Sequence, residues 1–367
     1  MRRAYLDHNA TSPLKPAARA AMLAAQDGHG NPSSVHREGR AARATLEAAR
    51  ETLARRIGVL PQMVTFVSGG TEANNLAVKG TPIERLVISA IEHPSVVEAA
   101  RARCVPTEVV PVDGNGRVRT DSLAAILDRS PLPALVSVML ANNETGVVQP
   151  IADVVDIART RNAIVHTDAV QALGKIPVNF PALGVDLLTL TAHKLGGPIG
   201  IGALVVRAGI ELEPQISGGA QELRRRGGTE NPAAVAGFAA ALEDTAMPLA
   251  PLRDRLEHAL AEVSPEVEIF GKDVERLPNT SCFAVKGIAA DTALISLDLD
   301  GVAVSSGAAC SSGKVGHSAV LQAMGVEPDT AKSAIRVSLG WSTTPEDIDT
   351  FIGAWRRIVE RLRKKAA

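Results

Sequence analysis

Short apolar runs alternate with longer stretches of helical periodicity over most of the chain. Seven runs rich in Val, Ile and Leu lack strict alternation, at residues 64–67, 86–89, 108–112, 135–140, 164–166, 187–190 and 203–206. Such runs are typical of strands buried on both faces. The stretches around them predict helices at 16–25, 35–57, 72–78, 95–103, 122–127 and 151–161. Strands and helices in alternation predict an α/β fold with a mostly parallel seven-stranded sheet covered on both faces.

The pattern changes after Pro232. Two long helical stretches, 233–245 and 249–262, precede strand-like runs at 267–270, 281–285, 302–304 and 334–338. A final helical stretch runs from 345 to about 364. This order predicts a smaller α+β C-terminal domain. We therefore expect a large domain over residues 14–245 and a small domain formed by residues 1–13 and 246–367.

Composition narrows the class of protein. The chain is 46% hydrophobic and 22% charged, which is ordinary for a globular protein. Its formal net charge of −1 argues against a broad nucleic-acid or membrane surface. We find no apolar stretch of the roughly 18 residues that a membrane helix needs, and no apolar signal core follows the two N-terminal arginines. We expect a cytoplasmic protein with neither a nucleic-acid nor a membrane partner.

A lysine and an aspartate follow two of the apolar runs. Lys194 comes after the run 187–190, and Asp168 comes after the run 164–166. The carboxyl ends of parallel strands meet at one edge of a sheet, so we expect the two side chains to lie near each other. A lysine for a Schiff base and an aspartate for a pyridinium nitrogen are what pyridoxal 5'-phosphate (PLP) chemistry needs. For either residue alone, a structural role is an equal alternative.

Other candidate residues also follow apolar runs. A glycine pair ending at Gly70, with Thr71 next, opens a helix, where free N–H groups and a hydroxyl could hold a phosphate. The Gly-Lys-Ser/Thr ending of a nucleotide P-loop is absent, and a simple capped helix is the alternative. His93 could stack on a planar ring or move protons, and Asn143 could hold a phenolic oxygen or a carboxylate. Taken singly, either is better explained as a polar loop residue.

Two further residues suggest contacts with a substrate. Arg336 lies in an apolar run, where a charge is costly unless it is paired; a substrate carboxylate or a structural salt bridge would pair it. Cys310 lies among small and polar residues at 304–313, which predict a mobile loop with an exposed, nucleophilic thiol. With Cys104 and Cys282 it makes an odd, widely spaced set, so neither a disulfide framework nor a metal cluster is expected.

Taken together, the motifs resemble those of the PLP-dependent cysteine desulfurases of the NifS/IscS type, within the class-V aminotransferase-like family. The resemblance runs nearly end to end. Its motifs include Tyr5-Leu-Asp7-His-Asn9, Ser68-Gly-Gly-Thr71-Glu72, Glu92-His93, Asn142-Asn143-Glu144, Asp168-Ala-Val-Gln171, His193-Lys194, Arg226-Gly-Gly-Thr229, Ser305-Ser-Gly-Ala-Ala-Cys310 and Arg336-Val-Ser-Leu-Gly340. The resemblance implies fold type I of the PLP-dependent transferases and PLP as the cofactor.

The resemblance also implies a role for each residue near the cofactor. Lys194 would form the Schiff base, Asp168 would pair with the pyridine nitrogen, and Gln171 would hydrogen-bond the phenolic oxygen. His93 would stack on the ring and move protons. The residues expected to hold the phosphate in the same subunit are Gly70, Thr71, Thr191 and His193. Thr229 would reach the phosphate of the partner subunit, which implies a homodimer.

On the substrate side, the resemblance implies that Asn143, which also lies beside the cofactor, and Arg336 hold the carboxylate of L-cysteine. Cys310 would take the sulfur as a persulfide while alanine leaves. The sulfur would then pass to an acceptor protein such as an iron–sulfur scaffold, or to a thiolation pathway. One alternative is a PLP aminotransferase or lyase acting on another amino acid, including selenocysteine, but transamination needs no loop thiol. Another is a sulfur-relay protein, which would not need the set Asp168, Gln171 and Lys194.

Overall fold

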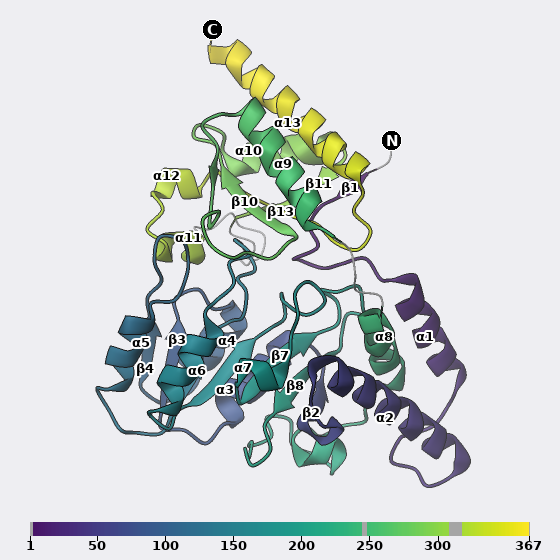
Figure 1. The fold of residues 1–367 in the computed structure, drawn as a ribbon. Coiled ribbons are helices and arrows are strands. Elements are labelled where there is room, and N and C mark those ends of the chain that lie inside the picture. Colours follow the sequence, from purple (N-terminus) through teal and green to yellow (C-terminus); the bar gives the residue numbers. More distant parts are fainter. Residues whose placement is uncertain (1–2, 244–247, 308–317, 367) are drawn as a thin grey trace.

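The main sheet has seven strands in the order β2-β8-β7-β6-β5-β3-β4 (Figure 1). The computed structural model describes residues 3–243, 248–307 and 318–366. The strands are β2 (Val64–Val67), β3 (Arg85–Ser89), β4 (Thr107–Val110), β5 (Ala134–Ser137), β6 (Ile164–Asp168), β7 (Leu187–Thr191) and β8 (Gly202–Val206). Strand β8 runs antiparallel to both of its neighbours, and the other pairs are parallel. The predicted mostly parallel seven-stranded sheet is therefore confirmed.

Helices cover both faces of this sheet (Figure 1). They are α1 (Pro16–Asp27), α2 (Arg37–Ile57), α3 (Gly70–Gly80), α4 (Pro94–Arg101), α5 (Thr120–Leu127), α6 (Ile151–Arg159), α7 (Phe180–Leu183) and α8 (Pro232–Glu243), with short 3-10 turns at Pro61–Met63 and Gln221–Arg224. Successive residues of β3 point to opposite faces. Leu86 lies in one apolar cluster with Leu76 of α3, and Val87 lies in another with Leu123 of α5. Burial on both faces explains why the strand runs lack polar alternation.

Helix α2 shows how local sequence sets an element. Its buried residues include Leu46, Leu53 and Ile57, at the spacing of one helical face. The ring of His36 caps its start by accepting a hydrogen bond from the backbone N–H of Gly39 at 3.2 Å. The helix ends at Gly58, whose φ of 77° is the left-handed conformation that glycine adopts readily.

A second layer of strands and helices lies above the main sheet in Figure 1. Its antiparallel sheet has the order β12-β13-β10-β9, and a separate parallel pair joins β1 to β11. The elements are β1 (Ala4–Tyr5), β9 (Glu268–Ile269), β10 (Thr280–Ala284), β11 (Val302–Ala303), β12 (Ser305–Ser306), β13 (Ala334–Ser338), α9 (Ala250–Val263), α10 (Ala290–Leu299), α11 (Ala319–Ala323), α12 (Pro328–Ala331) and α13 (Pro345–Ala366). Phe283, Phe351 and Trp355 are buried together in its core.

The prediction of a continuous loop over residues 304–313 is wrong for Ser305 and Ser306. These two residues form β12, which pairs with Arg336 and Ile335 of β13. Serines join a strand here because the backbone of β13 offers partners that no local pattern reveals. Cys310 lies outside the described residues, so its predicted loop is not tested.

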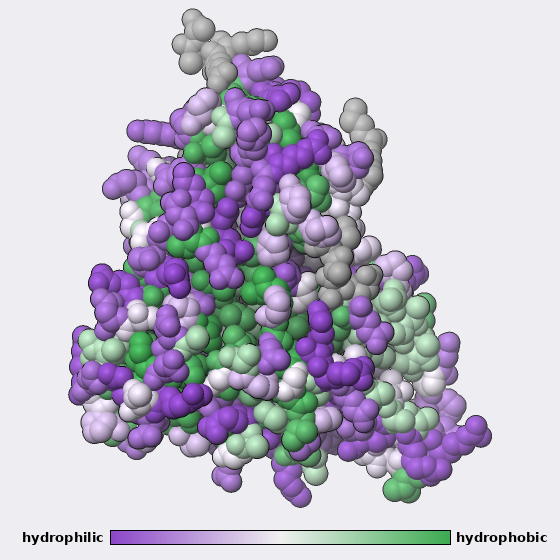
Figure 2. All heavy atoms as spheres, viewed as in Figure 1, coloured by the Kyte–Doolittle hydropathy of each residue, from purple (hydrophilic) through white to green (hydrophobic). Residues whose placement is uncertain are grey.

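Both layers present mixed surfaces. On the face in Figure 2, hydrophilic residues cover much of the upper layer, and hydrophobic residues gather in the middle, between the two layers. Across the residues described, no helix has both the length and the apolar character needed to cross a membrane.

The strand directions bring several loop starts to one edge. Gly202 of β8 is paired with Val67 at the end of β2 and with Thr191 at the end of β7. Asp168 ends β6, which is parallel to β7. Ligands bind at the carboxyl ends of strands in such sheets, and the candidate site lies at this edge.

Candidate active site

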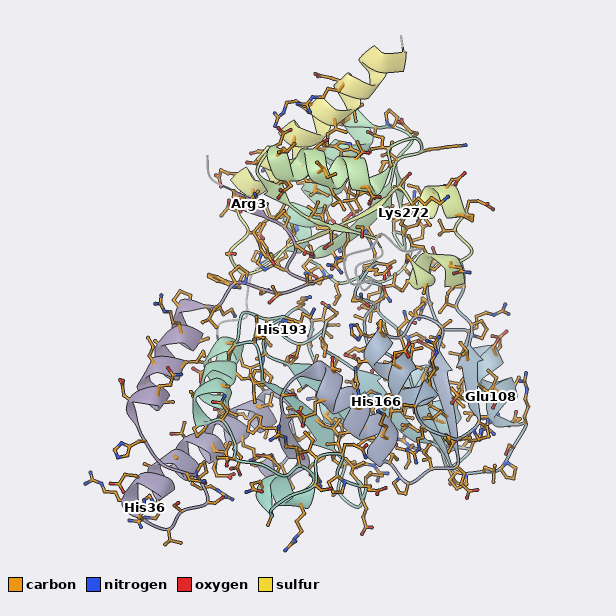
Figure 3. All side chains as sticks on the ribbon, turned by 180° about the vertical axis from the view of Figure 1, so that it is seen from behind. Arg3, His36, Glu108, His166, His193 and Lys272 are labelled. Atoms are coloured by element: carbon orange, nitrogen blue, oxygen red, sulfur yellow. The ribbon has the colours of Figure 1, made fainter. Side chains whose placement is uncertain are left out.

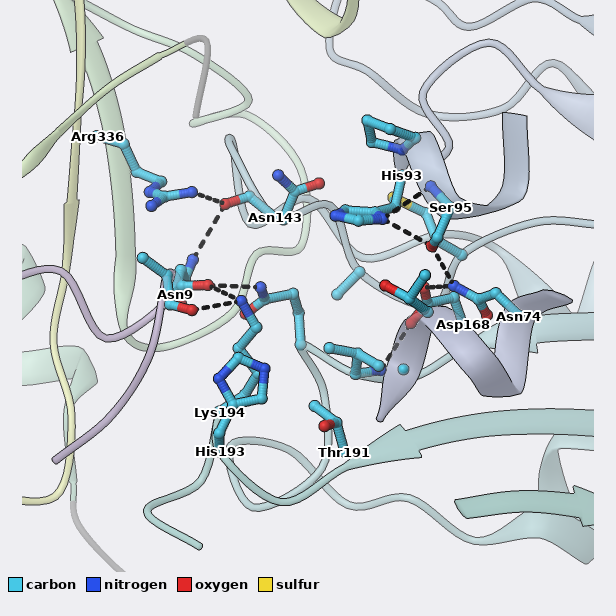
Figure 4. Close-up of a pocket in the computed structure, with 18 residues that line it drawn as sticks. Asn9, Asn74, His93, Ser95, Asn143, Asp168, Thr191, His193, Lys194 and Arg336 are labelled. Carbon is cyan, nitrogen blue, oxygen red and sulfur yellow. Dashed lines mark hydrogen bonds between the residues drawn. The ribbon is translucent and has the colours of Figure 1, made fainter. Parts of the chain in front are cut away.

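A cavity of about 410 Å³ opens at the carboxyl edge of the main sheet (Figure 4). It is lined by every predicted site residue except Thr229 and Cys310, namely Gly70, Thr71, His93, Asn143, Asp168, Gln171, Thr191, His193, Lys194 and Arg336. These residues come from both layers of the fold. The volume lies within the range of small-molecule and cofactor sites.

The other two predicted site residues are Thr229 and Cys310. Thr229 is exposed and is not among the lining residues. The resemblance gave it a role toward a partner subunit, and that role stays a prediction. Cys310 belongs to residues 308–317, which the structure does not describe.

The start of helix α3 forms one wall of the cavity. The helix begins at Gly70, and no side chain caps it, so its first-turn N–H groups suit an anion. Strand β8 approaches closely here, because a Cβ at Gly202 would lie 2.7 Å from the backbone carbonyl carbon of Gly69. Thr71 and Thr191 line the same cavity. The predicted phosphate-binding segment therefore has suitable geometry, although the structure does not test the role.

Asp168 is a buried carboxylate held by neutral donors. Its Oδ1 accepts the backbone N–H of Val170 at 2.9 Å, and its Oδ2 accepts Nδ2 of Asn74 at 2.7 Å. Its exposed fraction is 6%. Within the described ranges, no ion pair involves this carboxylate, so a cationic ring nitrogen would supply the charge that a buried carboxylate needs.

Lys194 follows β7 and lines the cavity. Its Nζ donates to the backbone carbonyls of Asn9, at 2.6 Å, and Ala10, at 2.7 Å. The N-terminal segment therefore positions the amine. His193 lies beside it where the two layers meet, whereas His166 lies lower, within the sheet (Figure 3). Burial and the charge of Lys194 lower the pKa of His193 to about 4, so its ring is neutral at pH 7.

His93 is the N-cap of helix α4. Its Nδ1 accepts the backbone N–H of Ser95 at 3.1 Å and lies 2.7 Å from the Ser95 hydroxyl. Burial lowers the pKa of His93 most, Asp168 opposes that shift, and Lys194 adds to it. The imidazole is therefore favoured in its neutral form.

Gln171 has its amide orientation fixed by a buried lysine. Lys175 Nζ donates to Gln171 Oε1 and to Asn9 Oδ1, both at 2.8 Å. Gln171 Nε2 donates to the Asn9 backbone carbonyl at 3.0 Å. Even a neutral amine has two hydrogens for these two oxygens, so Lys175 keeps the amide oxygen of Gln171 turned toward itself and the amide nitrogen turned away. Burial, Lys194 and Arg336 lower the pKa of Lys175.

Arg336 lies at the opposite side of the cavity from Asp168 (Figure 4). It is 1% exposed, forms an ion pair with Asp7 at 2.7 Å, and donates to the backbone carbonyl of Asn143 at 3.0 Å. The structural salt bridge, one of the two readings open from the sequence, is thus present. Arg336 Nε is buried without a partner among the described residues, so the guanidinium retains donor capacity.

Four residues that line or adjoin the cavity orient the predicted site residues by hydrogen bonds, although the sequence gave them no role: Asn9, Asn74, Ser95 and Lys175. Asn74 is the one with a local signal. It lies four residues after Gly70, so it shares the helix face that starts at the phosphate segment. Asn9 acts through contacts distant in sequence, whereas Ser95 and Lys175 each combine a near contact, to His93 and Gln171, with a distant one.

Comparison with known proteins agrees with this geometry. The family model for aminotransferase class-V matches residues 4–351. Cysteine desulfurase IscS of Dictyoglomus turgidum is 40% identical over 379 residues, covering 99% of this chain and 96% of that protein. A NifS-like protein from Rickettsia africae superposes with a TM-score of 0.89 at 36% identity, over 98% of this chain and 100% of its own. The structure of SspA in complex with cysteine gives a TM-score of 0.82 at 28% identity, over 93% of this chain and 100% of that chain.

The chain belongs to the aminotransferase class-V family. Its likeness to such proteins confirms the expected fold type I, α/β in class. Within that family its relatives place it among the cysteine desulfurases, which are PLP-dependent enzymes.

The residues present fit PLP. The cavity brings together a buried carboxylate that forms no ion pair with the described residues, an amine on Lys194 and a helix start at Gly70 that its N-cap residue leaves uncapped. These are the groups needed for a pyridine nitrogen, an aldehyde carbon and a phosphate. Gln171 adds an amide whose orientation is already set.

Proposed function

We propose that this chain converts L-cysteine to L-alanine and moves the sulfur to Cys310. The observation that carries the proposal is the meeting of Asp168, Lys194 and the start of helix α3 around one cavity. That set supports PLP chemistry on an amino acid, and the cysteine desulfurase relatives support cysteine as that amino acid.

The cofactor end of the cavity supports the bond-breaking chemistry. When bound, PLP supplies an electron-withdrawing ring that stabilises negative charge at the substrate Cα. Asp168 would face the protonated ring nitrogen, and Gln171 would donate to the phenolic oxygen. Lys194 would hold the aldehyde carbon of the cofactor, and Lys194 or His93 would move the Cα proton of the substrate. Gly70, Thr71, Thr191 and His193 would hold the phosphate.

The substrate end is formed by Arg336 and Asn143. We propose that both hold the carboxylate of cysteine. Arg336 is already oriented by Asp7 and by the carbonyl of Asn143. A positioned guanidinium loses little freedom on binding a carboxylate, and exclusion of water strengthens the contact.

Sulfur transfer balances without an added oxidant. The thiolate of Cys310 attacks the sulfur of the substrate, an S–S bond forms, and the C–S bond breaks. The electron pair of the C–S bond stays with the substrate carbon, which takes up a proton, so alanine leaves and Cys310 holds a persulfide. A thiol of an acceptor protein then receives the outer sulfur.

Four further features belong to this proposal. Thr229 contacts the phosphate in a second copy of the chain, so the active form is a homodimer. The sulfur acceptor is a protein such as an iron–sulfur scaffold. The location is cytoplasmic, and the domains are residues 14–245 on one side and 1–13 with 246–367 on the other, as expected from the sequence.

The test measures sulfide and alanine released from L-cysteine in the presence of a thiol reductant. Equal amounts of both products are expected from the parent protein and neither from Cys310→Ala. Cys104→Ala is the matched control, because Cys104 is an exposed cysteine that does not line the cavity.

Alkylation and mass spectrometry of the substrate-treated protein should find one extra sulfur on the Cys310 peptide. Turnover without alanine, or full activity in Cys310→Ala, would instead indicate a different PLP reaction. Retention of the PLP absorbance in Cys310→Ala would show that loss of activity is not loss of cofactor.

A further inference from the structure

A chain of buried hydrogen bonds joins Asp168 to His93 through two residues with no role in the proposal above. Asn74 on helix α3 donates from Nδ2 to Asp168 Oδ2 at 2.7 Å and to the Ser95 hydroxyl at 2.9 Å. The Ser95 hydroxyl lies 2.7 Å from Nδ1 of His93. Asn74 is 1% exposed and Ser95 is 8% exposed. The four side chains lie together on one side of the cavity in Figure 4.

The direction of the first two bonds follows from the carboxylate. An amide oxygen of Asn74 facing Asp168 would place two acceptors 2.7 Å apart with no proton between them, so the amino group must face Asp168. That amino group has two hydrogens. One goes to Asp168, and the other goes to Ser95, since the same Nδ2 lies 2.9 Å from the Ser95 hydroxyl.

The direction of the bond between Ser95 and His93 follows from the bond between Asn74 and Ser95. The Ser95 hydroxyl already accepts from Asn74, so its own hydrogen is available for Nδ1 of His93. The backbone N–H of Ser95 also donates to the same Nδ1 at 3.1 Å. The hydroxyl is the nearer of the two donors, at 2.7 Å, so it contributes most to the preference. With both hydrogens directed at Nδ1, the neutral ring carries its proton on Nε2.

We propose that Asn74 and Ser95 are positioning residues that hold the His93 imidazole with Nδ1 as acceptor and its proton on Nε2. Asn74 also donates to Asp168, so one network orients the group expected at the pyridine nitrogen and the group expected over the ring. This inference deepens the proposed function and rests on it for the roles of His93 and Asp168.

The position of the proton on the His93 ring determines which residue can accept the Cα proton. An imidazole whose Nε2 bears hydrogen donates at that atom and cannot accept there. Uptake of a proton at Nδ1 would require breaking both Ser95 contacts. Lys194 is therefore the group that accepts the Cα proton, and His93 is a hydrogen-bond donor to the reacting groups.

The tautomer can be measured directly in the substrate-free holoenzyme. Protein with nitrogen-15 in its histidine rings is studied by two-bond proton–nitrogen NMR, and His93→Gln identifies the His93 signals among those of the eight histidines. We expect one tautomer with hydrogen on Nε2 in the parent, and a mixture of tautomers in Ser95→Ala. Ser95→Thr keeps the hydroxyl and should restore the parent pattern.

Kinetics provide the second readout. Ser95→Ala should lower kcat about tenfold with little change in KM, because it disturbs the hydrogen bond that His93 donates to the reacting groups rather than substrate binding. Ser122→Ala is the matched control, since Ser122 is also in the first turn of a helix but lies outside the cavity. Asn74→Ala should give the same tautomer mixture, because it frees the Ser95 hydroxyl.

An unchanged tautomer in both Ser95→Ala and Asn74→Ala would overturn the inference, and so would failure of Ser95→Thr to restore the parent pattern. These NMR outcomes do not depend on the reaction. If the protein shows a single Nε2 tautomer but releases no sulfide from cysteine, the proposed function is contradicted and the hydrogen-bond network is still supported.

Discussion

Glu92, the residue before His93, is a buried carboxyl that should remain protonated at neutral pH. Its Oε1 accepts from the Ser89 hydroxyl and from the backbone N–H of Met139 at 2.8 Å. Its Oε2 has no hydrogen-bond partner among the residues that the structure describes. Burial raises the pKa of Glu92 to about 8, its two hydrogen bonds oppose the rise, and Asp168 adds to it.

The sign of the resulting pH dependence follows from proton binding. Between about pH 4.5 and pH 8, folded Glu92 keeps a proton that the unfolded chain has lost, so the free energy of unfolding falls as pH rises. The slope is about 1.4 kcal/mol per pH unit in the middle of this range. Glu92→Gln has no proton to lose. From pH 5.5 to pH 7.0, the parent should therefore lose about 2 kcal/mol relative to this variant.

Urea unfolding at several pH values measures this difference. Groups such as Glu144, whose pKa burial raises to about 7, titrate in both proteins and cancel in the comparison. Glu98→Gln is the control, because it makes the same chemical change at an exposed position of helix α4. A parent-minus-Glu92→Gln difference that stays constant from pH 5.5 to pH 7.0 would refute the reasoning and mean that folded Glu92 is ionised.

Three other changes test the fold and the cofactor site. Glu222→Gln breaks a buried pair in which both Glu222 oxygens meet Arg50 at 2.8 Å, so the free energy of unfolding from urea titration should fall by about 3 kcal/mol. Gly202→Ala places a Cβ 2.7 Å from the Gly69 backbone, and absorbance titration should show PLP affinity about tenfold weaker. Lys194→Ala should carry no cofactor mass on its peptide after borohydride reduction, whereas the parent should carry it on Lys194.

Local sequence predicts the large sheet well because six of its seven strands are continuous and mostly buried, the edge strand β4 being the exception. Strand β8, Gly202–Val206, is buried at all five positions, and it appears in the sequence as a run without any polar side chain. The polar residues that follow such runs, including Asp168 and Lys194, are predictable for the same reason: parallel strands bring their carboxyl ends together.

The short strands could not be predicted in this way. Strand β1 has two residues and forms by pairing Ala4 with Val302 and Tyr5 with Ala303. Strand β12 consists of Ser305 and its neighbour, held by β13. Such strands depend on partners far away in the sequence, and two residues are too few to show a period.

Asn9 shows the same limit within the site and explains how the two layers keep their spacing. Its backbone carbonyl accepts from Lys194 and Gln171 on the cofactor side. Its side chain accepts from Asn279 and donates to Thr280, which starts strand β10 of the small sheet. Each buried polar group left without a partner costs about 1–3 kcal/mol. Sliding one layer past the other would break several of these bonds together. The polar residue that no local pattern selects is therefore the one that holds the lysine and the substrate side of the cavity in a fixed relation.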